Sequence, residues 1–204
     1  MMIKEESIKW RNNKIQQQRF GISVIYNVIN NNELQTILNY NINRLEKFLP
    51  DTFIWYPKWH VTFVRCESVQ HPFNVSREEY AFLQLKELLK HQRPFLLKYK
   101  YSEIGEDGVL RSYFKKKKKN DFNIVDNFYK IKKLNYKIIE EPWISLGNIK
   151  LKSFENAEFY FDKLENIVGK FKIFDILVKE IECVYYEDIL LQNNMCIGSI
   201  SLGG

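Results

Sequence analysis

Two short segments of the chain carry the side chains best suited to chemistry. In WHVTFVRC, the alternation of a β-strand places His60 and Thr62 on one face and their apolar neighbours on the other. PWISLGNI repeats this pattern, with Trp143 and Ser145 on the polar face. Imidazole exchanges protons near neutral pH, whereas indole has an N–H donor but no titratable proton there. The two strands therefore match in every respect except the histidine.

Hydrophobic periodicity predicts the elements that carry the first segment. Asn31 or Asn32 can cap a helix, Ser76 with Glu79 forms a capping-box pattern, and the turn residues at 106–108 predict a hairpin. The expected elements are a strand over 20–28, a helix from about 31 to Pro50, a strand over 60–66, a helix from Ser76 to about Leu89, and a hairpin of strands over 95–102 and 109–114.

The second half repeats this plan. Its expected elements are a helix over 121–134, a short strand over 143–149, an amphipathic helix over 154–168, a long strand-rich segment over 171–186 and a last strand over 195–202. Each half thus has helix, short strand, helix and long strand. We therefore expect an α+β fold of two pseudo-symmetric lobes, each of antiparallel sheet and helices, around a central cleft. Residues 1–19 are treated as a polar leader, and residues 20–204 as a single bilobal domain.

At these segments the chain resembles the 2H phosphoesterases, which include the 2′-5′ RNA ligase-like proteins and the cyclic phosphodiesterases. That family carries two His-x-Thr/Ser motifs on the central strands of two pseudo-symmetric lobes. His60-Val61-Thr62 matches the first motif, while PFLLKYKYSEIGEDGVL and PWISLGNI look like a later strand and the second motif. Within the superfamily, WHVTFVRC and EEPWISLG are most similar to exonucleases that trim the 3′ end of a spliceosomal small nuclear RNA. The resemblance extends from Phe20 to Leu202.

The resemblance implies a metal-independent site without a cofactor. In the family, one imidazole removes a proton from the attacking oxygen and the other protonates the leaving oxygen. By this likeness His60, Thr62 and Ser145 are the catalytic candidates, with the two hydroxyls bonding the phosphate oxygens. Trp143 replaces the second histidine, and losing an acid–base partner typically lowers the rate about 10²–10⁴-fold. Trp143 becomes a substrate-binding candidate, as a stacking platform for a base.

Each of these candidates also has an ordinary structural interpretation. His60 can be a hydrogen-bonded histidine on a half-exposed strand, and Trp143 can fill the cleft as additional core. Two other histidines are present, His71 in the segment QHPFN and His91 near a predicted helix end. We do not expect either of them to reach the cleft and replace the missing imidazole.

The net charge of +6 favours polyanionic partners, because basic surface attracts phosphates. Five lysines in a row occupy Lys115 to Lys119. Of these, Lys115, Lys116 and Lys117 are candidate phosphate contacts, and the alternative is a solvated loop.

Other features restrict the setting of the protein. No apolar run long enough to cross a bilayer is present, and no secretory signal is recognisable. Cys66, Cys183 and Cys196 lack a metal-ligand spacing and suit reduced thiols. We therefore expect a cytoplasmic protein, with the nucleus as the alternative, and no membrane partner. P-loop, zinc-ligand, dinucleotide-binding and nucleophile-elbow patterns are missing, which disfavours kinases, zinc hydrolases and dehydrogenases.

Two classes of function remain open at this point. The first is a phosphodiesterase acting on RNA 3′ ends, 2′,3′-cyclic phosphates, or 2′-5′-linked or cyclic nucleotides, with His60 as the retained acid or base. The second is a non-catalytic module that binds a nucleotide or RNA in the inherited cleft. A cleft reused for a non-nucleotide substrate or a protein partner is a third alternative.

Overall fold

A computed structural model gives the architecture of residues 2–66, 75–116, 125–127, 130, 136–188, 190–191 and 194–203. The strands are β1 (Gln18–Asn27), β2 (Phe53–Trp55), β3 (His60–Cys66), β4 (Phe95–Ile104), β5 (Val109–Lys116), β6 (Tyr136–Ile138), β7 (Trp143–Ile149), β8 (Ile176–Val178), β9 (Glu180–Asp188) and β10 (Asn194–Ser201). The helices are α1 (Glu5–Ile15), α2 (Asn32–Phe48), α3 (Val75–Leu89), α5 (Phe154–Phe159) and α6 (Phe161–Gly169), with 3₁₀ turns η1 (Val28–Asn30) and η2 (Leu151–Ser153).

Local sequence signals account for most of these boundaries. The Asn31 side chain accepts a hydrogen bond from the Leu34 backbone N–H at 2.9 Å and caps α2, as its sequence predicts. The β4–β5 hairpin turns at Gly108, which has a φ of +70°. The two strands that carry the candidate site residues begin and end where the sequence predicts. Of the expected helix over 121–134, only 125–127 and 130 lie within the described residues, where they are helical.

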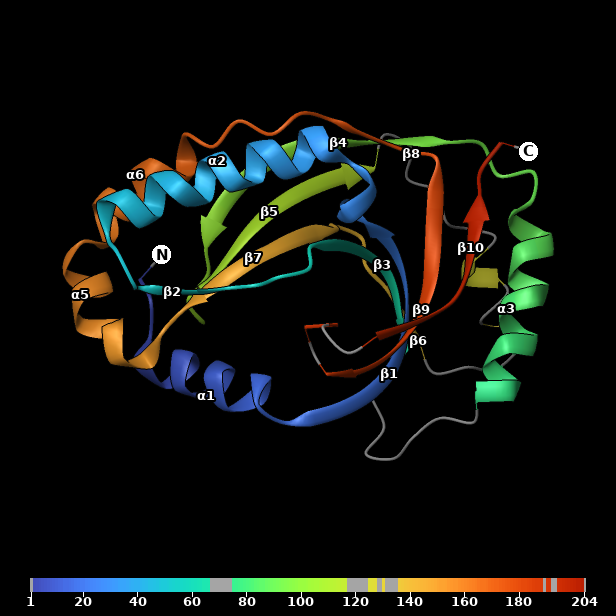
Figure 1. The fold of residues 1–204 in the computed structure, drawn as a ribbon, viewed down its shortest axis with the longest axis horizontal. Coiled ribbons are helices and arrows are strands. Elements are labelled where there is room, and N and C mark those ends of the chain that lie inside the picture. Colours follow the sequence, from blue (N-terminus) through green and yellow to red (C-terminus); the bar gives the residue numbers. More distant parts are fainter. Residues whose placement is uncertain are drawn as a thin grey trace.

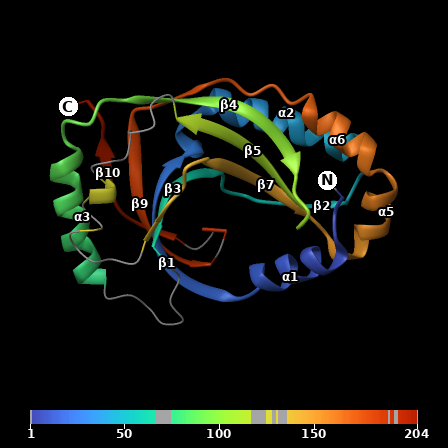
Figure 2. The same ribbon diagram turned by 180° about the vertical axis from the view of Figure 1, so that it is seen from behind.

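A single antiparallel sheet contains every described strand. Its order is β10-β9-β1-β3-β7-β5-β4-β8, and β2 and β6 pair additionally with β7 and β3. The sheet curls strongly, with α2 and α6 along one part of it and α3 beside β10 (Figures 1 and 2). Only Lys179 separates β8, at one end of the strand order, from β9, the strand next to the other end, so the curl brings these two parts of the sheet close together.

An approximate two-fold relates the two halves of the sheet at the level of single residues. Val61 of β3 pairs with Ile144 of β7. On one side of that pair, β3 pairs with β6 through Val64–Ile138, Arg65–Lys137 and Cys66–Tyr136. At the equivalent places, β7 pairs with β2 through Gly147–Trp55, Asn148–Ile54 and Ile149–Phe53. The register irregularities of β1 against β3 and of β5 against β7 fall at equivalent positions too. The axis therefore passes through the Val61–Ile144 pair.

The core lies between the helices and one face of the sheet. Side chains that are completely buried there include Leu34, Leu38 and Leu45 of α2, Phe63 of β3 and Leu164 of α6. The alternation along β3 and β7 is confirmed, since Val61, Phe63, Ile144 and Leu146 are fully buried. The molecule has the expected α+β fold with two lobes, one built on β9-β1-β3 and the other on β7-β5-β4.

Three features of the fold differ from the periodicity. Residues 1–19, treated as a polar leader, contain α1, whose Ile8 is completely buried and whose Asn12 bonds the Ile149 carbonyl. The helix expected over 154–168 divides at Tyr160, which has φ −100° and ψ 15°. The strand-rich segment over 171–186 supplies two strands, because β8 pairs with β4 whereas β9 pairs with β1 and β10. One straight strand cannot reach both partners.

Candidate functional site

The pairing of β3 with β7 gathers the four predicted motif residues on one face of the sheet. Val61 lies opposite Ile144, and both side chains point into the core. Antiparallel register therefore sets His60 opposite Ser145 and Thr62 opposite Trp143, all four on the face away from α2 and α6. Each is only partly buried, so solvent and ligands can reach this face.

A further residue flanks each motif position symmetrically. Asn27 of β1 pairs with His60, and Tyr113 of β5 pairs with Trp143. Asn27 donates to Glu182 at 3.2 Å, and the Tyr113 hydroxyl is hydrogen-bonded to Glu103. The two half-sites thus share one plan, with an amide and an imidazole in the first lobe and two aromatic rings in the second.

The indole N–H of Trp143 points along its own strand, toward Ser145. The indole Nε1 donates to the Ser145 hydroxyl at 3.2 Å, so the proline-flanked Trp-x-Ser motif is internally bonded. Its ring lies 6.0 Å from Tyr113 at an angle of 46°, and Tyr113 stacks on Tyr101 at 4.9 Å. The tyrosines fix the indole from one side. The Ser145 hydroxyl accepts from the indole and keeps its own proton for another acceptor.

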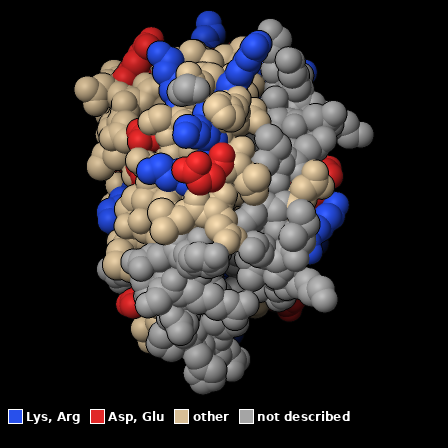
Figure 3. All heavy atoms as spheres, turned by 90° about the vertical axis from the view of Figure 1, so that its right-hand side faces the viewer, with Lys and Arg blue, Asp and Glu red and all other residues tan. Residues whose placement is uncertain are grey.

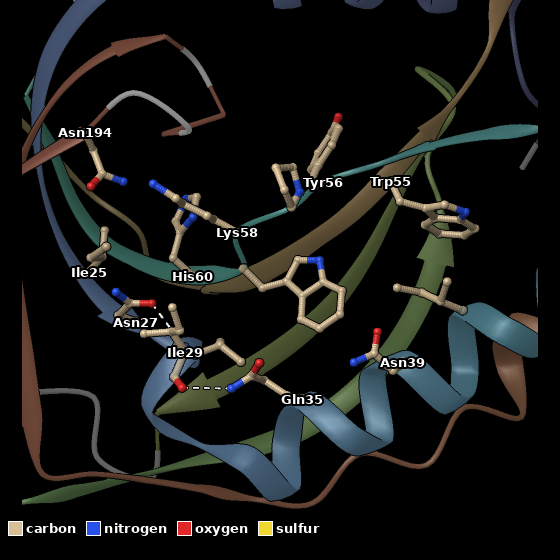
Figure 4. Close-up of a pocket in the computed structure, with 14 residues that line it drawn as sticks. Ile25, Asn27, Ile29, Gln35, Asn39, Trp55, Tyr56, Lys58, His60 and Asn194 are labelled. Carbon is tan, nitrogen blue, oxygen red and sulfur yellow. Dashed lines mark hydrogen bonds between the residues drawn. The ribbon is translucent and has the colours of Figure 1, made fainter.

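His60, the first residue of β3, lines a cavity of about 550 Å³. In Figure 4, His60 and Lys58 extend to the same side of the chain, away from α2, while Gln35 and Asn39 approach from that helix. Amide side chains are the most frequent polar groups of its wall, which contains Asn27, Gln35, Asn39 and Asn194. The Trp59 indole N–H, also in this wall, has no hydrogen-bond partner within the described residues. A volume of this size is typical of a small-molecule site.

The surroundings of His60 keep its imidazole neutral. Burial lowers the pKa of His60 to about 4, and the negative charge of Asp188 and a hydrogen bond to the Lys58 backbone only partly oppose that shift. At neutral pH the ring is therefore uncharged and can accept a proton. Its low pKa makes it a weak base, because general-base catalysis is most effective when the pKa lies near the working pH.

Among the described residues of the second lobe, the phenols beside Trp143 are poor acids. Burial raises the pKa of Tyr113 to about 12, and burial likewise raises the pKa of Tyr101. Both phenols consequently keep their protons and bind as hydrogen-bond donors. His91 lies exposed beyond the end of α3 and is not part of the cavity wall, and His71 lies outside the described residues.

The predicted lysines lie at different places. Lys115 and Lys116 are consecutive residues of β5, so they project to opposite faces, Lys115 to the face of His60. Lys117, Lys118 and Lys119 lie outside the described residues. On the side where α3 and β10 lie, basic side chains mix with acidic ones (Figure 3), so its described part is not uniformly positive.

Four residues of the site were not identified from the sequence: Asn27, Lys58, Tyr113 and Asn194. Lys58 had a recognisable signal, since it precedes His60 by two positions and shares its side of the chain. The others come from β1, β5 and β10, and only the pairing of distant strands brings them to the motif residues.

Two general properties complete the description. Among the described residues, no group of three or more His, Cys, Asp or Glu side chains is arranged to hold a metal ion. Within the same part of the chain, no helix is long and apolar enough to span a membrane.

Comparison with known proteins yields structural likeness alone. No protein-family model matches the chain, and no curated protein does. Among solved structures, that of Kluyveromyces marxianus Usb1 with uridine monophosphate superposes with a TM-score of 0.49 at 11% identity, covering 87% of this chain and 97% of that one. Another structure of Kluyveromyces marxianus Usb1 gives a TM-score of 0.47 at 12% identity over the same shares.

Proposed function

We propose that this protein binds nucleotides with a phosphodiester or cyclic phosphate, foremost RNA 3′ ends, on the face shared by β3 and β7. The phosphate lies against His60, Thr62 and Ser145, and a base stacks on Trp143. In this proposal the protein is 2H phosphoesterase-like, and turnover is weak or lost because the second imidazole is missing.

The pairing of the two motif strands at Val61 and Ile144 is the observation that carries this proposal. This pairing supports the proposal because it puts an imidazole, two hydroxyls and an aromatic ring on one face of two adjacent strands. Hydroxyls and a lysine such as Lys58 supply donors and positive charge for phosphate oxygens. An aromatic face next to a phosphate site suits a base, because base–aromatic stacking contributes about 1–3 kcal/mol.

In this proposal the two lobes contact different parts of the ligand. The first lobe has the imidazole, Lys58 and the amide-lined cavity, which suit polar groups. The second has Trp143 backed by Tyr113 and Tyr101, which suit the flat, apolar surface of a base.

The protonation states favour binding over turnover. Cleaving a phosphodiester without a metal needs a base for the attacking oxygen and an acid for the leaving oxygen. A neutral His60 can act as the base. Indole cannot supply the acid, and a phenol with a pKa of about 12, as in Tyr113, transfers its proton only reluctantly.

Binding and turnover must be measured separately to test this proposal. Calorimetric titration with a nucleoside 2′,3′-cyclic phosphate should show binding, and His60→Ala should weaken it. Chromatography of the same mixtures should show slow or undetectable ring opening. Any turnover present should fall at least about a hundredfold in His60→Ala, given the usual size of an acid–base contribution.

His91→Ala is the matched control, because it removes an exposed imidazole outside the site. It should bind and turn over the ligand like the native protein. Absence of binding to any nucleotide or RNA, or binding that His60→Ala leaves unchanged, would refute the proposal. The cleft would then serve a non-nucleotide ligand.

A further inference from the structure

A strip of aromatic and basic side chains continues the site across the second lobe. Phe114 of β5 is completely buried, so its neighbours Tyr113 and Lys115 project from the opposite face, the face of His60. Across the ladder, Tyr101 of β4 pairs with Tyr113, and Lys98 pairs with Lys115. We call these four residues the β4–β5 strip.

Two lysines face each other directly in this strip. Like charges opposite one another in an antiparallel pair are destabilising. Among the described residues neither Lys98 nor Lys115 takes part in a salt bridge, whereas Lys100, in the irregular stretch between Tyr99 and Tyr101, pairs with Glu141 at 2.6 Å. Two lysines that face each other and take part in no salt bridge among the described residues break a local rule of sheet stability, and such exceptions are expected at functional sites.

The aromatic rings connect this lysine pair to the motif residues. Tyr101 stacks on Tyr113, and Tyr113 contacts Trp143. Glu103, which is hydrogen-bonded to the Tyr113 hydroxyl, lies opposite Arg111 in the ladder, on the side of Tyr113 that faces away from Lys115. Aromatic surface flanked by lysines is how proteins follow single-stranded nucleic acid, with rings for bases and cations for the backbone.

We propose that Lys98 and Lys115 bind a second phosphate of the ligand, so that the protein prefers a single-stranded RNA segment to a mononucleotide. This inference rests on the proposed function, which places the first phosphate at His60. Two residues along a strand span about 6.6 Å, so Lys115 lies one step beyond the Tyr113 ring. A nucleoside 2′,3′-cyclic phosphate has a single phosphate and cannot occupy both places.

The double variant Lys98→Ala/Lys115→Ala separates the two phosphate contacts. Its affinity for a single-stranded RNA hexamer should fall about tenfold at low salt, the usual size of a lost charged contact. The slope of log affinity against log salt should become shallower by about 0.7 for each phosphate contact removed. Affinity for a nucleoside 2′,3′-cyclic phosphate should stay unchanged.

Two further variants make the result decisive. Lys86→Ala/Lys90→Ala, the α3 variant, removes the same charge from the last turn of α3 and from the residue that follows it, outside the sheet, and should leave hexamer affinity unchanged. Lys98→Arg/Lys115→Arg retains the charge and should retain the affinity. The second phosphate site is overturned if the α3 variant loses as much hexamer affinity as the strip variant, or if the strip variant loses none. The proposed function can still hold in that case, because it is upheld separately by cyclic-phosphate binding that depends on His60. If the native protein binds neither ligand, both proposals fail.

Discussion

Trp143 occupies the place that the two-fold relates to His60, and its contacts explain what such a replacement does. The indole bonds Ser145 and rests against Tyr113, so it is held in one orientation. A second imidazole would be a proton donor for a leaving oxygen, whereas a fixed indole is a surface. Under the proposed function, an indole at this place therefore separates ligand recognition from proton transfer at the scale of one residue.

Restoring the missing imidazole tests this separation. Trp143→His should produce phosphodiester cleavage, or raise it well above the native rate, because the two rings would share one face of the sheet. The same change should weaken nucleotide binding, since a smaller ring offers less stacking area. Both effects can be followed by chromatographic turnover assays and calorimetric titration of the same preparation.

Trp143→Phe is the control for that experiment. Phenylalanine retains an aromatic face but has no titratable group, so it should bind nucleotide and show no gain in turnover. Equal gains in both variants would mean that removing the indole, rather than adding an imidazole, is what matters.

At the scale of elements, the sequence predicts those strands whose side chains alternate in type. The limits of β3 and β7 follow from their alternation, and the cap of α2 follows from Asn31. The short strands β2 and β6 have no such pattern and form only because each pairs with the other lobe's central strand. For the same reason the sequence indicates His60 and Trp143 as equivalent but not Tyr113, whose role depends on pairing across β5 and β7.

The pairing of β2 with β7 depends on the absence of a side chain at Gly147. A Cβ at Gly147 would lie 2.6 Å from the Ile54 carbonyl oxygen and 2.8 Å from the Trp55 ring. Trp55 cannot readily retreat, because it stacks on Phe53 and donates to Glu46 of α2. Gly147→Ala should therefore lower the free energy of unfolding by about 1–3 kcal/mol, the usual cost of overpacking.

Gly169→Ala is the matched substitution at the end of α6. No atom lies within 4 Å of a Cβ built there, so the change should be neutral or slightly stabilising. Urea denaturation of both variants measures the difference. If Gly147→Ala were as stable as Gly169→Ala, close packing of β2 on β7 would not be what positions the segment leading to His60.

At the scale of the whole molecule, the two-fold gives the protein two similar half-sites with different chemistry. The first lobe has an imidazole, amides and a lysine, and the second has three aromatic rings. The sheet joins them at the Val61–Ile144 pair and through β2 and β6, which each pair with the other lobe's central strand. A bound nucleotide would contact both lobes and therefore stabilise the complete fold, because ligands that bind only the native state shift unfolding by mass action.

The unusual imidazole of His60 couples the stability of the whole fold to pH. The pKa of His60 is about 4 in the folded protein, against an ordinary value of 6.5. Between these two values the unfolded chain binds a proton that the folded one does not. The free energy of unfolding should therefore be fully retained above about pH 6.5 and should decrease as the pH falls toward 4, with a slope approaching about 1.4 kcal/mol per pH unit.

Urea denaturation at pH values from 7 down to 4 measures this slope. The pH range over which stability decreases identifies the group that binds the proton. The pKa of Asp107 is lowered from its ordinary value of 3.8 by its ion pair with Arg111, although burial opposes this, so its contribution is lost only below that value. His60→Asn should flatten the profile between pH 6.5 and 4, because asparagine does not titrate. His91→Asn should leave the native slope in place, since it removes an imidazole from the exposed turn after α3. A native slope that persists in His60→Asn would show that another group binds the proton and that the imidazole of His60 is not kept neutral by its surroundings.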